Sequence, residues 1–329
     1  MKQILNYLFN HQTLSKAEAK AIMIELAQGK FNETEATAFV TVYMMRPITL
    51  EELRGFREAL LDLALTVDLG TTDLVDIVGT GGDGKDTFNI STLASFIVAG
   101  AGQKVAKHGN YGVSSISGAS NVLETLGYRF KTNTEDLKSD LDRANICFLH
   151  APLFHPALKA VAGLRKGLQL RTFFNLLGPL VNPARPQYSI LGVYSLEVAR
   201  LYQYLLQQEP QDFMLLHALD GYDEISLTQD TKVIDHRGEY IYSAEDLGFQ
   251  TIPAEALSGG GSKEEAAAIF KTILEGKGTP EQNAVVLANA AMALYATHHF
   301  GNYQDCLQLA KDSLYQGKAY QCLQNLIKS

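Results

Sequence analysis

The feature that most constrains this chain is a glycine-rich stretch, residues 78–92, between two apolar segments. The apolar run 74–78 predicts a buried strand, and residues 93–100 predict a helix. A strand, a glycine turn and a helix present unpaired backbone N–H groups to an anion, because glycine permits close approach and the helix N-terminus adds a positive dipole. Ser91 and Thr92 stand where they could cap this helix or bind phosphate oxygens. The stretch therefore predicts a phosphate site.

Two general phosphate-binding motifs almost match this stretch. Three glycines fit G-x-G-x-x-G from Gly79 onward, but glutamine and lysine stand about twenty positions later, where the dinucleotide fold needs an acidic residue. The P-loop pattern is also nearly complete, but Asp86 occupies the place of the Ser or Thr that binds magnesium. A glycine-rich turn without a ligand is the remaining alternative. The spacing alone predicts a phosphate site of neither standard type.

Composition narrows the class of protein. The 329 residues are 46% hydrophobic and 19% charged, which is typical of a globular chain of about two domains. The net charge of −8 argues against non-specific nucleic-acid binding, which needs a basic surface. The three cysteines are widely spaced and predict a reducing compartment rather than a disulfide framework or a zinc site. We find no signal-peptide pattern and no apolar run of membrane-spanning length, and we expect a cytoplasmic protein that binds no membrane.

The pattern along the chain predicts an α/β fold with a mostly parallel sheet flanked by helices and a smaller, all-helical N-terminal domain. Capping-box patterns at Ser15, Asn32 and Thr49 each precede apolar residues at helical spacing. From Asp73 onward strands alternate with helices, so ligands should bind at the carboxyl ends of the strands. The expected strands are 74–78, 103–107, 146–149, 189–193 and 212–217, followed by a hairpin over 232–242. The expected helices after Asp73 are 92–100, 118–127, 134–143, 156–162, 195–208, 264–274, 280–298 and one from 303 onward. We expected four positions, Gly79, His108, Ala151 and Ala218, to lie just past strand ends.

Several separate motifs together are more specific than either general pattern. They are G-T-G-G-D with N-I-S-T in 79–92, K-H-G-N at 107–110, F-F-N-L-L-G-P at 173–179 and L-D-G-Y-D-E-I-S at 219–226. In order and spacing the chain resembles the anthranilate phosphoribosyltransferases, which share a structural family with the pyrimidine nucleoside phosphorylases. The resemblance implies a helical domain, 1–70, to which a segment at about 164–186 returns. It also implies an α/β domain, 71–163 and 187–329, that binds 5-phosphoribosyl-1-diphosphate (PRPP).

The resemblance also implies which residues meet the substrates, PRPP and anthranilate. The guanidinium fork of Arg165 suits the carboxylate of anthranilate, and Lys107 suits a phosphate. Asp223 and Glu224 would bind Mg²⁺, with Ser91 contributing to a second ion, because magnesium prefers hard oxygen ligands completed by substrate phosphates. No residue is assigned a covalent or acid–base role, and a homodimer is implied. The substrate-binding set is Gly79, Gly81, Gly82, Asp83, Thr87, Asn89, Ser91, Thr92, Lys107, His108, Asn110, Ser115, His155 and Arg165.

Two alternatives and one departure from the family pattern stay open at this stage. A pyrimidine nucleoside phosphorylase would need only inorganic phosphate and no acidic magnesium pair. A non-catalytic homologue that binds nucleic acid is opposed by the charge of −8. The family pattern reads Lys-His-Gly-Asn-Arg, whereas here Tyr111 follows Asn110. We expect Tyr111 to line the substrate entrance, with a hydroxyl that contributes little to turnover.

Overall fold

The computed structural model describes residues 1–112, 116–168 and 170–328, which form two compact units. The helical unit consists of Met1–Val67 and Ala151–Pro183, and the sheet unit consists of Asp68–His150 and Ala184–Ser329. The segment that returns to the helical unit begins at Ala151, earlier than the expected position 164.

Local capping signals define the helices of the helical unit. Ser15, Asn32 and Thr49 each accept a hydrogen bond from a backbone N–H three residues later, and a glutamate returns the bond in each case, so the predicted capping boxes are confirmed. The N-terminal helices are α1 (Lys2–Phe9), α2 (Lys16–Ala27), α3 (Glu33–Met45) and α4 (Leu50–Leu63). The returning segment adds α8 (Ala151–Phe154), η1 (Pro156–Val161), α9 (Ala162–Leu168), α10 (Phe174–Leu177) and η2 (Gly178–Leu180).

An aromatic cluster joins the returning segment to the N-terminal helices. Phe173 stacks on Phe56 with ring centroids 4.8 Å apart and makes edge contacts with Tyr43 at 5.1 Å and Phe39 at 6.3 Å. The backbone N–H of Leu65 also donates to the carbonyl of Phe154 across 2.8 Å. Aromatic pairs of this kind stabilise by more than their buried area alone. These contacts explain why two segments far apart in sequence form one unit.

The sheet unit is built on seven strands, within its described residues, in the order β3-β2-β1-β4-β5-β6-β7. The first five strands of this order are parallel, and the last two pair antiparallel as the expected hairpin. This confirms the predicted fold class. The strands are β1 (Val75–Gly79), β2 (Val105–Gly109), β3 (Ile146–His150), β4 (Tyr188–Gly192), β5 (Asp212–Ala218), β6 (Thr231–Asp235) and β7 (Gly238–Tyr242).

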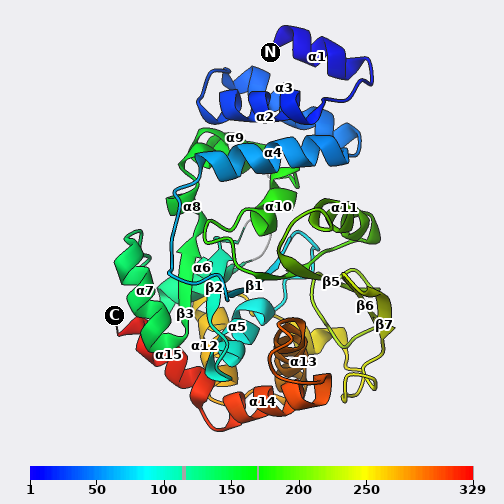
Figure 1. Cartoon of the computed structure of the whole chain (residues 1–329). Coiled ribbons are helices and arrows are strands. Elements are labelled where there is room, and N and C mark those ends of the chain that lie inside the picture. Colours follow the sequence, from blue (N-terminus) through cyan, green and yellow to red (C-terminus); the bar gives the residue numbers. More distant parts are fainter. Residues whose placement is uncertain (113–115, 169, 329) are drawn as a thin grey trace. The chain divides into compact units, whose positions relative to one another are not determined.

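Helices flank this sheet (Figure 1), and two of them contribute many of its buried apolar residues. The apolar helices α5 (Ile90–Gly100) and α13 (Pro280–Ala296) pack on each other, and both contact central strands. Phe96 of α5 is fully buried and meets Phe270 of α12 (Lys263–Leu274) edge-on, with ring centroids 5.9 Å apart. The helices of this unit are α5 (Ile90–Gly100), α6 (Ala119–Thr125), α7 (Thr134–Ala144), α11 (Leu196–Leu206), η3 (Ala254–Leu257), α12 (Lys263–Leu274), α13 (Pro280–Ala296), α14 (Tyr303–Tyr315) and α15 (Lys318–Ile327). None of the helices in the described part of the chain has the length and apolar character needed to span a membrane.

Candidate active site

The glycine loop, residues 79–89, connects β1 to α5 at the carboxyl edge of the parallel strands. Gly81, Gly82 and Gly84 have φ angles of 62°, 72° and 75°, in the left-handed region that favours glycine. The backbone N–H of Gly81 donates to Asp223 Oδ2 across 2.7 Å, which joins the loop to an acidic residue far along the chain. The loop therefore has a backbone conformation that allows an anion to approach closely, and the Asp223 carboxylate accepts a bond from one of its N–H groups.

The helix after this loop begins two residues earlier than predicted. Asn89 is the N-terminal cap residue of α5, so the expected capping position of Ser91 and Thr92 is wrong, and both lie in the first helical turn. The Asn89 side chain makes no cap bond and instead donates to the carbonyl of Ser117 across 3.0 Å. The N–H of Ser91 donates to Glu224 Oε1 across 3.2 Å, whereas Thr92 is buried. The helix start thus meets the second acidic residue directly.

Asp223 lies over the ends of two neighbouring strands. Gly79 and Gly192 are register partners at the carboxyl ends of β1 and β4. A Cβ at Gly79 would collide with the Asp223 carboxylate, and a Cβ at Gly192 would collide with its backbone carbonyl, standing 2.6 Å from the carbonyl carbon. The strand order changes direction at β1 and β4, which is where open α/β sheets bind ligands. The glycines therefore make room for an acidic residue at the expected binding edge.

A buried asparagine holds the segment that follows these acids. Asn289 of α13 donates from Nδ2 to the carbonyl of Ile225 across 2.8 Å and accepts from the N–H of Ile225 across 3.1 Å. Both backbone groups of the residue after Glu224 are thereby fixed. Sequence reasoning missed Asn289 and Gly192. The sequence signal for Asn289 was one polar residue within an apolar helix, and the signal for Gly192 was one glycine at a strand end.

The electrostatics of the acidic residues suit a divalent cation. Burial raises the pKa of Asp223, and the nearby charge of Asp83 raises it further. Burial and the charge of Asp223 raise the pKa of Glu224 well above its ordinary value. Glu224 Oε2 is buried and has no hydrogen-bond partner among the described residues. Hard carboxylate oxygens that repel one another and retain an unused acceptor fit Mg²⁺.

The protein groups alone do not make a complete metal cage. Within the described residues, no group of three or more His, Cys, Asp or Glu side chains has an arrangement that could hold a metal ion. Magnesium in phosphate-handling sites is usually held by one or two carboxylates plus oxygens of the substrate. Asp223 and Glu224 match that smaller donor set.

Lys107 and His108 lie within β2 rather than after it, which corrects the expected position of His108 beyond the strand end. Both are buried, and the Lys107 ammonium donates to the carbonyl of Ile77. Burial lowers the pKa of Lys107, while the charges of Asp76 and Glu224 oppose that shift. Lys107 thus lies near enough to Glu224 for their charges to interact, and its contact with a phosphate stays a prediction. Gly79 and Ala218 are the last residues of their strands, so they do not lie past the strand ends either. Of the four positions expected past strand ends, only Ala151 follows its strand.

Asn110 and Tyr111 follow β2. The Asn110 side chain accepts from the N–H of Tyr111 across 2.8 Å, and its carbonyl accepts from the N–H of Ser120 across 3.1 Å. The Tyr111 ring meets His150 edge-on with centroids 4.8 Å apart, and its hydroxyl donates to Glu124 across 3.3 Å. The hydroxyl of Tyr111 is therefore engaged by a side chain of α6. Ser115 lies outside the described residues.

His155 and Arg165 belong to the helical unit. His155 is buried, its Nε2 lies 2.9 Å from the carbonyl of Val181, and burial lowers its pKa to about 4. Arg165 lies on α9, and its side chain is outside the described part of the structure. The structure therefore brings together Gly79, Gly81, Asp83, Ser91, Asp223 and Glu224, with Asn89 on the same loop, and the predicted anthranilate contacts remain predictions.

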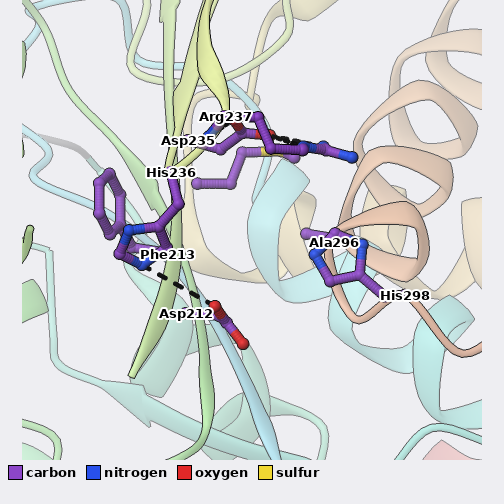
Figure 2. A pocket seen from close by; sticks show the side chains of 8 residues that line it. Asp212, Phe213, Asp235, His236, Arg237, Ala296 and His298 are labelled. Carbon is purple, nitrogen blue, oxygen red and sulfur yellow. Dashed lines mark hydrogen bonds and ion pairs between the residues drawn. The ribbon is translucent and has the colours of Figure 1, made fainter. Parts of the chain in front are cut away.

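A separate small pocket lies at the amino end of β5 (Figure 2). Figure 2 shows Arg237 directed toward Asp235, and its guanidinium also donates to the Tyr295 hydroxyl across 3.2 Å. His236 is 3.8 Å from Asp212. The charged groups of this pocket are paired with one another, and none is a predicted site residue.

Two family models match the chain. The glycosyl transferase family a/b domain matches residues 71–320, and the glycosyl transferase family helical bundle domain matches residues 2–64. Anthranilate phosphoribosyltransferase of Christiangramia forsetii is 53% identical to this chain, over 100% of this chain and 99% of the relative. The Flavobacterium johnsoniae enzyme of the same name is 54% identical, over 99% and 98%.

Solved structures show the same similarity. The anthranilate phosphoribosyltransferase structure from Thermus thermophilus superposes with a TM-score of 0.90 at 32% identity, covering 98% of each chain. The structure of the Saccharomyces cerevisiae enzyme in complex with PRPP and Mg has a TM-score of 0.90 at 27% identity, covering 98% of this chain and 96% of that chain.

Proposed function

The chain belongs to the anthranilate phosphoribosyltransferases of the glycosyl transferase family, and we propose that it transfers the phosphoribosyl group of PRPP to the amine of anthranilate. Diphosphate is released, and the product belongs to tryptophan biosynthesis. The observation that carries this proposal is the acidic pair beside the glycine loop, with Asp223 placed over Gly79 and Gly192 and Glu224 at the start of α5.

The proposal gives separate tasks to the residues of the sheet unit. The N–H groups and left-handed glycines of the glycine loop would bind the diphosphate. Asp223 and Glu224, with Ser91, would hold magnesium, which supplies positive charge against the leaving diphosphate. Gly192 and Asn289 keep the acidic pair in place.

Displacement at C1 of PRPP passes through a state with positive charge on the sugar. The residues must hold the leaving group and align a weak aromatic nucleophile, and this positioning can supply much of the rate. The family resemblance supports the predicted contacts of Arg165, His155, His108 and Asn110 with the aromatic acid. No strong base is required, because the aromatic ammonium formed on attack loses its proton readily to water.

The same proposal includes a homodimer formed through the helical unit. Helices α1 and α3 contact each other and expose large apolar side chains: Tyr7 43%, Phe9 59%, Met44 37% and Met45 84%. An exposed apolar group of this size is typical of an association surface. The three cysteines are buried free thiols, which supports a cytoplasmic location. Sedimentation velocity tests the dimer: M45D should shift the protein to the monomer.

The catalytic proposal is tested by measuring diphosphate release from PRPP with and without anthranilate and magnesium. We expect release only when all three are present, with the anthranilate adduct detected by mass spectrometry. Phosphorolysis of a pyrimidine nucleoside by inorganic phosphate would identify a nucleoside phosphorylase instead. Absence of both activities from folded protein would contradict the proposal.

A further inference from the structure

Asp86, at the far side of the glycine loop, has an unusual backbone conformation. Its φ angle is 52°, in the left-handed region where Asp, Asn and Gly are tolerated better than other residues. In this conformation its Oδ1 accepts a hydrogen bond from the backbone N–H of Ile116 across 3.0 Å. Ile116 belongs to the connection between β2 and α6, so a single side chain links two different loops of the sheet unit.

The backbone around Asp86 is fixed by a third segment. The N–H of Gly259 donates to the Asp86 carbonyl across 3.0 Å, and the N–H of Phe88 donates to the Leu257 carbonyl across 3.0 Å. A Cβ at Gly259 would stand 2.7 Å from the carbonyl oxygen of Thr87, so glycine is required for this close approach. The Asp86 backbone is therefore anchored, and its carboxylate is presented to Ile116 from a fixed base.

A second bond from the same loop reaches the same partner. Asn89 Nδ2 donates to the carbonyl of Ser117 across 3.0 Å, and Ser117 directly follows Ile116, whose N–H donates to Asp86. Residues 116–118 lead directly into α6, whose N-terminal cap residue is Gly118. The glycine loop thus makes two hydrogen bonds to this segment, one with the N–H of Ile116 and one with the carbonyl of Ser117.

We propose that Asp86 is a positioning residue that fixes residues 116–118 against the glycine loop, so that both segments meet the phosphates of PRPP in one prearranged site. This rests on the proposed function. Asp86 acts through the hydrogen bond it accepts and binds neither metal nor substrate. Asp86, which prevents a P-loop assignment in the sequence, therefore has a positioning role in the fold.

Three variants separate the backbone conformation, the acceptor and the charge. D86N keeps the side-chain oxygen and tolerates positive φ but removes the charge. D86G accommodates positive φ but removes the acceptor. D86A removes the acceptor and strains the backbone. N145G is the matched control, because Asn145 also has a left-handed φ of 54° and one side-chain bond to a backbone carbonyl in the same unit.

We expect D86N to match the wild type, because it retains the acceptor. D86G should raise KM for PRPP about three- to tenfold, the range for one lost hydrogen bond, while kcat changes less than about twofold. D86A should raise KM at least as much and also lower the melting temperature. N145G should leave KM for PRPP unchanged.

A D86G enzyme with the wild-type KM for PRPP would overturn the proposal. A D86N enzyme as impaired as D86A would also overturn it, because the charge of Asp86 and not its acceptor oxygen would then matter. Hydrogen–deuterium exchange of the unliganded protein provides a test independent of catalysis. The peptide containing Ile116 should exchange faster in D86G than in wild type, D86N and N145G. Unchanged exchange would contradict the hydrogen bond even if the enzyme proved to act on another substrate.

Discussion

Replacing Gly192 by alanine adds only one methyl group, and it tests directly whether the acidic pair must keep its position. The added Cβ would overlap the Asp223 carbonyl oxygen and stand 2.6 Å from its carbonyl carbon, whereas non-bonded carbons settle about 3.5–4.0 Å apart. One of the two segments must therefore move by at least about 1 Å. Overpacking of this kind costs about 1–3 kcal/mol of folding free energy.

The catalytic cost should be larger than the stability cost. A displacement of about 1 Å in a positioned group can reduce the rate about 100-fold. We therefore expect kcat/KM for PRPP to fall about 100-fold in G192A, with the magnesium concentration for half-maximal rate raised. The assay is the initial rate of diphosphate release across a magnesium series, with thermal unfolding measured on the same samples.

G163A is the matched control. Gly163 lies in α9, and a Cβ there would meet nothing within 4 Å. It should retain wild-type magnesium dependence and unfold at the same or a slightly higher temperature. A G192A enzyme within about threefold of wild type would refute the reasoning, because Asp223 would then tolerate displacement.

Three further predictions concern other parts of the chain. Arg165→Ala should raise KM for anthranilate about ten- to a hundredfold and leave KM for PRPP nearly unchanged, because one charge-assisted bond to a carboxylate is lost; equal effects on both constants would indicate a structural role. Tyr111→Phe should change kcat/KM little, because its hydroxyl donates to a glutamate of α6, whereas Asn110→Ala should be severe; equal losses in the two variants would assign the hydroxyl a catalytic task. Burial raises the pKa of Glu52, but bonds from Arg46 and from backbone N–H groups outweigh it, so the folded pKa lies below the unfolded value. The stability from Glu52 should therefore be complete above the unfolded pKa of about 4.3 and disappear as pH falls through the lower folded pKa. In urea titrations Glu52→Gln should lose about 3 kcal/mol at neutral pH, and a wild-type advantage that persists unchanged at pH 2 would contradict this account.

Local signals in the sequence predicted the elements well. The capping boxes at Ser15, Asn32 and Thr49 depend on residues three positions apart, so the sequence contains all the required information. The strands follow from short apolar runs bounded by turn residues, and each observed strand overlaps its expected range. The start of α5 was misplaced because Ser91 and Asn89 are both good cap residues, and Asn89 holds the cap position although its side chain bonds Ser117 instead of the helix N–H groups.

Long-range contacts account for what the sequence did not predict. The returning segment begins at Ala151 because Phe154 bonds Leu65 just after α4 and Phe173 contacts the N-terminal helices, and no local pattern encodes that choice. Gly192 and Asn289 serve the acidic pair only through the folded sheet, although each is ordinary in its own strand or helix. The motifs identified the residues that we predict to meet ligands, and the structure adds the residues that hold them in place.

The central claim is that Asp223 and Glu224 hold the metal that accompanies the diphosphate of PRPP. Electron paramagnetic resonance of Mn²⁺ in place of Mg²⁺ measures this directly, by titrating the free ion signal against protein with and without PRPP. We expect wild-type protein to bind Mn²⁺ much more tightly when PRPP is present, since the substrate completes a small set of protein ligands. The folded double variant D223N/E224Q should lose that PRPP-dependent binding. Unchanged Mn²⁺ binding by the double variant in the presence of PRPP would contradict the account.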